Sequence, residues 1–318
     1  MANSTEYSGI TTKNKKSTKF KSQLYLQIFA IMGIAFIILF SYTTMVGIII
    51  AFKQYSITTG IKGFFTSPWV GLKHFKRFVR GVHFWEVTWN TIILSSLKLL
   101  FGFPLPIILA LMINSVKNEK FKRVVQTVSY LPHFMSWIVV WGLLFAFLNG
   151  QNGLINVFLV KTGLRDTPVS FLSDPSWFRP IAVISELWKE MGWNSIIYLA
   201  AIAGIDPSLY EAAIIDGSNR LQRTWYITLP SIRDTAVLLL ILAISGLFSG
   251  GLEQSLLLGN AVNAPVSNII SKYSFEQGLV GGRYSFATAI GLFQSVIAFA
   301  LLLLSNYIAK KVTDTSLF

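Results

Sequence analysis

Residues 206–230 read DPSLYEAAIIDGSNRLQRTWYITLP and lie between two long apolar segments. Asp206 followed by Pro207 is typical of a helix start, because aspartate caps the first turn and proline fits the first helical position. Gly217 predicts the end of this helix after about ten residues, since glycine favours helix C-termini. A second short helix is expected to begin at residue 218 or 219, so the stretch forms two short helices joined by a turn.

The middle of the first short helix is formed by Glu211, Ala212 and Ala213. Two of these side chains are too small to hold a neighbouring molecule at a distance. Because the helix belongs to a connector between apolar segments, a soluble protein can approach it closely. The sequence therefore predicts a docking surface at this connector.

The composition indicates a protein that crosses a membrane several times. Of 318 residues, 53% are hydrophobic and 13% are charged, and the mean hydropathy is +0.57. A soluble domain of this length cannot bury so much apolar surface, whereas a helix bundle facing lipid need not bury it. The chain has no cysteine, which excludes disulfides, thiol nucleophiles and thiolate metal sites. We expect an all-α polytopic membrane protein.

The net charge of +13 is spread over many loops. Basic residues in the loops of a membrane protein serve as topology signals or contact lipid headgroups, and the sequence has no cluster of basic and aromatic residues typical of a nucleic-acid site. Membrane lipid, and no nucleic acid, is therefore expected among the partners.

Six segments have the apolar character of transmembrane helices, each of which needs about twenty residues to cross the hydrocarbon. They are residues 22–52, 91–113, 133–148, 181–205, 235–252 and 284–309. Within the second segment, the run GFPLP at 102–106 is expected to kink or break the helix, because proline removes a backbone donor.

The N-terminal tail predicts the orientation of the chain. A basic cluster precedes a hydrophobic run that is far too long for a cleavable signal. The cluster consists of Lys13, Lys15, Lys16, Lys19 and Lys21. It indicates a cytoplasmic anchor, and six spans then place both termini in the cytoplasm. The basic residues of the other loops favour this orientation only weakly.

We divide the chain into five parts. They are a basic cytoplasmic tail (1–23), a first transmembrane helix (24–52), an external loop (53–87), a five-helix core (88–312) that contains the connector 206–232, and a cytoplasmic C-terminus (313–318). The external loop is rich in basic residues and in Phe, Trp and Gly, so we expect it to lie along the outer face of the membrane.

The connector resembles the cytoplasmic EAA loop of ATP-binding-cassette (ABC) importer permeases. The family pattern runs E-A-A, then G, then I-x-L-P. The matching positions in this chain are Glu211, Ala212, Ala213, Asp216, Gly217, Ile227, Leu229 and Pro230. Ser218 represents the small residue that usually follows the glycine, whereas Asn219 and Arg220 depart from the pattern.

The resemblance implies the six-helix fold of a type I ABC importer permease in a bacterial cell membrane. The first short helix of the loop would be the coupling helix, which inserts into a groove of the ATPase subunit and transmits its motion. The implied partners are a second homologous permease, forming a heterodimer, a cytoplasmic dimer of ABC ATPases and an extracellular solute-binding lipoprotein. ATP and magnesium would be used by the ATPase, so no cofactor or metal is expected on this chain.

A closer resemblance is to the permeases of oligosaccharide importers, such as those for maltose and polysaccharides. It rests on the stretches 90–91, 102–111, 130–132, 188–193 and 198–207. Together with the loop, the resemblance covers residues 25–311. It implies that the chain forms the translocation path for an oligosaccharide.

The fourth predicted span carries polar residues on one face. Glu186, Glu190, Asn194 and Tyr198 follow each other at intervals of four, and Trp193 joins that side. Carboxylates and amides within a membrane are expensive unless they face a cavity or a partner. Together with an aromatic ring they suit a sugar. The two glutamates alternatively form ion pairs with lysines, or lie at headgroup level.

Other polar and aromatic residues leave two interpretations open. Lys98 is expected to be a structural ion-pair partner rather than a substrate ligand, because a buried ammonium needs a counter-charge. Trp137 and Trp141 either line the path or pack. His133 has no second ligand at metal spacing, so we expect it to cap or pack. Weaker candidates for the same cavity are Glu253, Gln254 and Gln294.

The sequence contains no phosphate-binding glycine loop, nucleophile elbow or zinc motif. We therefore expect a transport subunit without catalytic residues. An ion-coupled carrier or channel would show interrupted spans in symmetric halves, and a membrane enzyme would show convergent acid-base or metal-binding residues. A permease for a non-sugar solute is the alternative that shares the loop.

Overall fold

The computed structural model describes residues 14–313 and 316–317, and side chains from residue 23 onward. The basic cluster of the predicted tail lies outside the residues whose side chains are described. The chain divides into two compact units, Met1–Ile50 and Ala51–Phe318. Within the described residues the regular structure is helical, with one isolated bridge between Lys53 and Trp69, so the predicted all-α class is confirmed.

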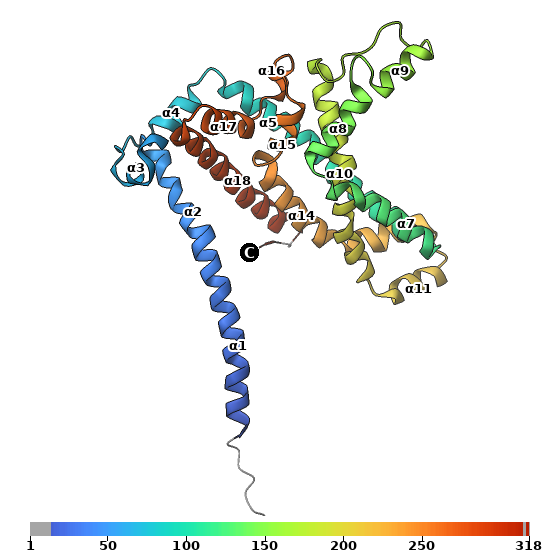
Figure 1. The fold of residues 1–318 in the computed structure, drawn as a ribbon. Helices are drawn as coiled ribbons and strands as arrows, with labels where there is room; N and C mark the ends of the chain where they lie inside the picture. Colours follow the sequence, from blue (N-terminus) through green and yellow to red (C-terminus); the bar gives the residue numbers. More distant parts are fainter. Residues whose placement is uncertain (1–13, 314–315, 318) are drawn as a thin grey trace, which may run out of the picture. The chain divides into compact units, whose positions relative to one another are not determined.

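The described part of the first unit belongs to one long helix, drawn in blue in Figure 1. It runs through α1 (Asn14–Ile37), a π-helical turn (Ile38–Tyr42), α2 (Thr43–Val46) and a 3-10 turn (Gly47–Phe52). The portion Gln23–Phe52 has the length and hydropathy of a membrane span, as predicted. A single helix has no interior, so its apolar side chains need lipid or another protein around them.

Two further helices are long enough to cross a membrane. The first joins α5 (Phe84–Gly102) to α6 (Pro104–Ser115) with only Phe103 non-helical between them. The predicted interruption is therefore confined to one residue, because the prolines fall in the first turn of α6, where no backbone donor is needed. The second is α18 (Tyr284–Thr313), close to the predicted range.

Three other predicted spans are bent helix pairs. α7 (Glu119–Tyr130) and a 3-10 turn meet α8 (Trp137–Leu148) at 102°, and α10 (Pro175–Ala203) meets α11 (Pro207–Ile215) at 71°. The third pair joins the segment Arg220–Ser231, which contains α12 (Arg220–Arg223) and α13 (Leu229–Ser231), to Arg233–Phe248 at 60°. The described residues thus contain three to six candidate spans by length and composition.

Two predicted spans differ from the helices at one end. The third is predicted from about residue 133, with or without the preceding turn, whereas residues 131–134 form a 3-10 turn and α8 begins at Trp137. The fifth does not reach residue 252, because α14 (Arg233–Ser245) and its 3-10 extension end at Phe248. Gly251 has φ of +83° and directly precedes α15 (Leu252–Leu258), a position where glycine adopts the left-handed conformation without strain.

Short helices occupy the segments between the spans. α3 (Gly60–Thr66) and α4 (Lys73–Val79) lie in the predicted external loop, and α9 (Leu154–Lys161) follows α8. After α15 come α16 (Ala264–Ser267), α17 (Ile270–Phe275) and a π-helical turn (Glu276–Val280).

α10 is the central helix of the second unit and packs against α5, α6 and α7. One buried cluster around Ala182 and Val183 joins it to Leu94 of α5, and another joins Tyr198 to Ala110 of α6. At Gly192 the backbone of α7 comes so close that an added Cβ would collide with the carbonyl group of Ser129. Only glycine permits this approach.

Gly192→Ala should therefore separate α7 from α10 and lower the free energy of unfolding by about 1–3 kcal/mol. Gly142→Ala is the matched control, because a Cβ at Gly142 of α8 meets no atom within 4 Å and alanine favours a helix more than glycine does. Thermal unfolding of the two purified variants in detergent measures both effects. Equal midpoints for the two variants would contradict the predicted contact.

Candidate functional site: a docking loop and a polar cavity

The docking loop begins with a capped helix, as predicted. The Asp206 carboxylate accepts a hydrogen bond from the backbone N–H of Ser208 at 2.9 Å, and Pro207 occupies the first position of α11. Such a cap satisfies a backbone donor that the helix leaves free. The start of α11 is thus determined by two adjacent residues of the sequence.

The predicted turn at Gly217 is also confirmed. Gly217 has φ of +77°, and the N–H of Ser218 donates to the carbonyl of Ala213 at 2.9 Å. This closes α11 with the left-handed turn that glycine favours. Asn219 then caps α12, exchanging hydrogen bonds with Gln222 at 2.7 and 2.9 Å.

The loop residues that match the pattern divide into an exposed and an anchored group. Glu211, Ala212, Asp216 and Gly217 are exposed on α11 and its turn. Leu229 instead packs in the buried cluster with Tyr198 and Ile232. The hydroxyls of Tyr210 and Thr228 lie 2.9 Å apart and join α11 to the returning chain. The first group can meet a partner, and the second fastens the loop to the membrane helices.

Exposed apolar residues accompany the first group, and the sequence analysis did not identify them. Ile215 is 85% exposed and Ile214 is 58% exposed. Across the turn, Leu221, Trp225 and Tyr226 are also exposed. The sequence did carry a signal for these residues, namely large apolar side chains on a short, capped connector. A connector helix with an exposed apolar face is typical of a partner-binding surface.

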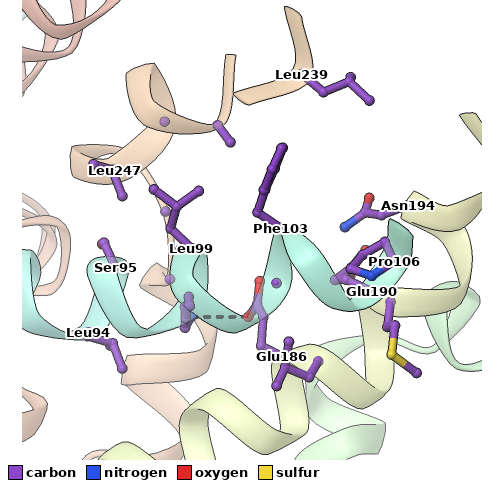
Figure 2. Close-up of a pocket in the computed structure, with 18 of the residues that line it drawn as sticks. Leu94, Ser95, Leu99, Phe103, Pro106, Glu186, Glu190, Asn194, Leu239 and Leu247 are labelled. Carbon is purple, nitrogen blue, oxygen red and sulfur yellow. Dashed lines mark hydrogen bonds and ion pairs between the residues drawn. The ribbon is translucent and has the colours of Figure 1, made fainter. Parts of the chain in front are cut away.

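The second unit contains a cavity of about 350 Å³ between α5, α6, α10 and residues 239–251. Figure 2 shows Glu186, Glu190 and Asn194 of α10 on one side, with Phe103 projecting into the space between the helices. Tyr198 also lines the cavity. The structure therefore brings together the four polar residues that the four-residue spacing placed on one face.

Lys98 of α5 is held by two groups at the edge of this cavity. Its Nζ lies 3.1 Å from Oε2 of Glu186 and 2.6 Å from Oε1 of Gln254; the dashed line at Glu186 in Figure 2 marks the ion pair. Gln254 is buried and donates to the Ala182 carbonyl and the Ser185 hydroxyl. This network ties α5, α10 and α15 together.

Glu190 is paired with two residues other than Lys98. Its two oxygens lie 2.7 Å from Nδ1 of His133 and 2.7 Å from Nζ of Lys189. Lys189 also donates to the His133 carbonyl at 2.9 Å. His133 therefore does more than pack, because it joins the turn between α7 and α8 to a charged pair on α10.

The three tryptophans that the sequence offered as candidates for the substrate path, Trp137, Trp141 and Trp193, do not line the cavity. Trp193 stacks on His133 with ring centroids 4.3 Å apart. The ring of Trp137 lies 5.8 Å from Nζ of Lys189, and Trp141 packs on Phe145. Of the weaker candidates, Gln294 donates to the Phe248 carbonyl, and Glu253 is exposed on α15.

Comparison with known protein families identifies the family of this chain. Residues 102–314 match the family described as binding-protein-dependent transport system inner membrane component. The chain belongs to this family. Protein LplB of Bacillus subtilis (strain 168) is 44% identical over 298 residues, which cover 94% of this chain and 92% of that protein. The polygalacturonan/rhamnogalacturonan transport system permease protein YteP of the same strain is 43% identical over 300 residues, with the same coverage.

A solved structure extends the similarity to three dimensions. The crystal structure of a bacterial alginate ABC transporter in complex with an alginate pentasaccharide-bound periplasmic protein has a chain that is 39% identical to this one. The match covers 94% of this chain and 99% of that chain, with a TM-score of 0.84. The type I ABC importer permease fold predicted from the sequence is thereby confirmed.

As a binding-protein-dependent transport component, the chain needs a path for solute, and the cavity offers carboxylate, amide, hydroxyl and apolar groups for it. Both glutamates are already paired with cations inside the protein. Within the described residues, no group of three or more His, Asp or Glu side chains is placed to hold a metal. The polar groups of the cavity wall are thus a mixture of paired carboxylates, an amide and a phenol.

The Lys98–Glu186 pair of this permease can be tested by a double-mutant cycle. Lys98→Met leaves Glu186 without its cation and Glu186→Gln leaves Lys98 without its anion, so each single variant should unfold at a lower temperature. The double variant should lose less stability than the two single variants lose together, with a coupling energy of about 1–3 kcal/mol. Thermal unfolding of the four purified proteins gives the coupling, and strict additivity would show that the pair has no energetic role.

Proposed function

We propose that this permease imports oligosaccharides, powered by a separate ATPase that docks on α11. The observation that carries the proposal is the continuity of α10 and α11. Glu186, Glu190, Asn194 and Tyr198 of α10 line the cavity, and only residues 204–206 separate α10 from the exposed coupling helix α11. A displacement of α11 therefore acts directly on the wall of the cavity.

The names of the relatives support a saccharide as the solute. YteP is named a polygalacturonan/rhamnogalacturonan transport permease, and AraP of Bacillus subtilis, 27% identical over 274 residues, is named an arabinooligosaccharides transport system permease. The solved alginate transporter is bound to a pentasaccharide-loaded protein. The amide, phenol and paired carboxylates of the cavity fit hydroxyl groups, which both donate and accept hydrogen bonds.

The proposed assembly contains this chain, a second, similar permease, two ATPase subunits and an extracellular solute-binding lipoprotein. The ATPases use ATP and magnesium, and this chain supplies no hydrolytic group. The proposed location is the bacterial cell membrane with both termini in the cytoplasm. In the cycle, ATP-driven closure of the ATPases moves α11, the binding protein releases the saccharide into the cavity, and hydrolysis resets the helices.

The docking surface is tested by Glu211→Lys and Gly217→Pro. The first reverses the charge of an exposed residue on α11, and the second is incompatible with the φ of +77° at Gly217, since proline requires a negative φ. Both should abolish uptake and ATPase binding while the permease still inserts into the membrane. Asp166→Lys is the control, because it makes the same charge change at an exposed position in the connection after α9.

Uptake of labelled solute and recovery of the ATPase during purification are the two measurements. Wild-type uptake in Glu211→Lys would contradict the assignment of α11 as the coupling helix. Loss of uptake in Asp166→Lys as well would show that the effect is not specific to the loop.

The substrate class is tested on the reconstituted complex with its binding protein. ATP hydrolysis should rise when an oligosaccharide is added, with neutral and uronate-containing oligosaccharides compared separately, and should stay at its basal rate with amino acids or dipeptides. If amino acids alone stimulated hydrolysis, the solute would not be a sugar, but the assignment as an importer permease would remain.

A further inference from the structure

The charged side chains of residues 51–85 are all basic. The segment contains six basic residues and no aspartate or glutamate, and the first carboxylate to follow is Glu86. The basic residues are Lys53, Lys62, Lys73, Lys76, Arg77 and Arg80. Neither the cavity nor the docking loop uses this segment. A local excess of positive charge without internal compensation requires an external anion or exposure to water.

α4 arranges four of these cations in one row. Lys73, Lys76, Arg77 and Arg80 follow each other at helical spacings of three, one and three residues, so they share one face of the helix. On the other side, His74 and Phe78 are buried, with 8% and 2% of their surface exposed. We call the four residues the α4 basic stripe.

Within the part of the chain that the structure describes, no carboxylate pairs with the stripe. Lys73 reaches only the neutral amide oxygen of Gln54, at 3.3 Å, and the guanidinium of Arg77 lies 5.3 Å from the ring centre of Phe286. The side chains of Lys76 and Arg80 are exposed and form no hydrogen bond or ion pair with the described residues. Burial, together with the charges of Lys73 and Arg77, holds the pKa of the neighbouring His74 below its ordinary value.

The position of α4 is set by the beginnings of two spans. Phe78 packs edge-on against Phe84, the first residue of α5, with centroids 5.1 Å apart, and against Phe286 near the start of α18, at 6.4 Å. The N–H of Tyr55 donates to the Ser285 hydroxyl at 3.0 Å. Figure 1 shows α4 against this end of α18. The stripe therefore lies at the level where spans emerge from the hydrocarbon, which is the headgroup layer.

Large apolar side chains are exposed in the same segment as the stripe. Ile61 is 84% exposed and Val82 is 93% exposed. Phe65, Trp69 and Trp85 are also largely exposed. A surface that combines cations with exposed aromatic and aliphatic groups at the end of a span is typical of contact with the membrane interface, where rings enter the acyl boundary and cations meet phosphates.

We propose that the α4 basic stripe binds the phosphate groups of anionic phospholipids at the membrane surface where α5 and α18 begin. Lysine and arginine form charge-assisted hydrogen bonds with phosphate oxygens, and anionic lipids attract basic segments near the surface. The exposed apolar residues favour lipid over an acidic protein partner, because they sit beside the cations at the end of two spans. This site anchors the outer ends of α5 and α18 to the lipid.

The absence of cysteine makes the test direct. Val82→Cys introduces the single cysteine of this chain beside the stripe; it is labelled with an environment-sensitive fluorophore in a transporter whose other subunits carry no reactive cysteine. The complete transporter is reconstituted into vesicles of phosphatidylcholine alone or with increasing phosphatidylglycerol. The emission should move to shorter wavelength as phosphatidylglycerol is added, and the shift should reverse at high salt, because salt screens exposed charges.

Lys76→Gln/Arg80→Gln should weaken this response. The apparent affinity for phosphatidylglycerol should fall by about fivefold for each cation removed. The matched control is Lys161→Gln/Arg165→Gln, which removes the same charge at two exposed residues, the last of α9 and one that follows it, and should leave the shift unchanged. Each single variant, Lys76→Gln or Arg80→Gln, gives the same test with a smaller effect if the double variant does not assemble.

Three outcomes would overturn the proposal. The first is identical emission in the two kinds of vesicle, and the second is a phosphatidylglycerol response that Lys76→Gln/Arg80→Gln leaves unchanged. The third is a shift that requires the solute-binding protein and is independent of phosphatidylglycerol, which would assign the surface to that protein. Transport can fail or succeed independently of each result, because the label reports lipid contact directly.

Discussion

The pairing of charges on α10 is the constraint on which the rest of the second unit depends. Glu186, Lys189 and Glu190 lie within five consecutive residues of a helix that packs at the centre of the unit. A charge in such surroundings must be paired, since its desolvation is otherwise too costly. Glu186 finds Lys98 of α5, whereas Glu190 finds His133 before α8. Each pair brings a different helix to α10, and the cavity is the space that remains between them.

The parts of this arrangement that depend on neighbouring residues could be predicted from the sequence. The caps at Asp206 and Gly217 involve atoms only a few residues apart, and the apolar character of the spans is a local property. The 102° bend before α8 could not be predicted, because hydropathy is the same whether an apolar helix continues or turns. The partnership of Lys98 with Gln254 was equally hidden, since 156 residues separate them and no local pattern relates them.

Trp193 shows how far helical spacing can be taken. At about 100° per residue, Trp193 lies about 20° from Glu186 around the helix axis. Glu190, Asn194 and Tyr198 are rotated away from Glu186 in the opposite direction. Trp193 therefore belongs to the edge of the polar face, beside Lys189, and stacks on His133 rather than facing the cavity. The four-residue spacing predicted the polar face of α10 correctly. The edge of this face depends on the side chains that pack beside the helix, and these come from distant parts of the sequence.

The docking loop and the cavity form one mechanical system because one helix serves both. The exposed head of the loop can move with a partner, while Leu229 holds the returning chain in the cluster that contains Tyr198, a residue of the cavity wall. A push on α11 consequently reaches the cavity by two routes, through α10 itself and through this cluster. Motion of one helix changes a cavity only if its opposite wall stays in place. That wall is α5, and the α4 basic stripe, packed through Phe78 against the first residue of α5, would hold it at the membrane surface while α10 moves.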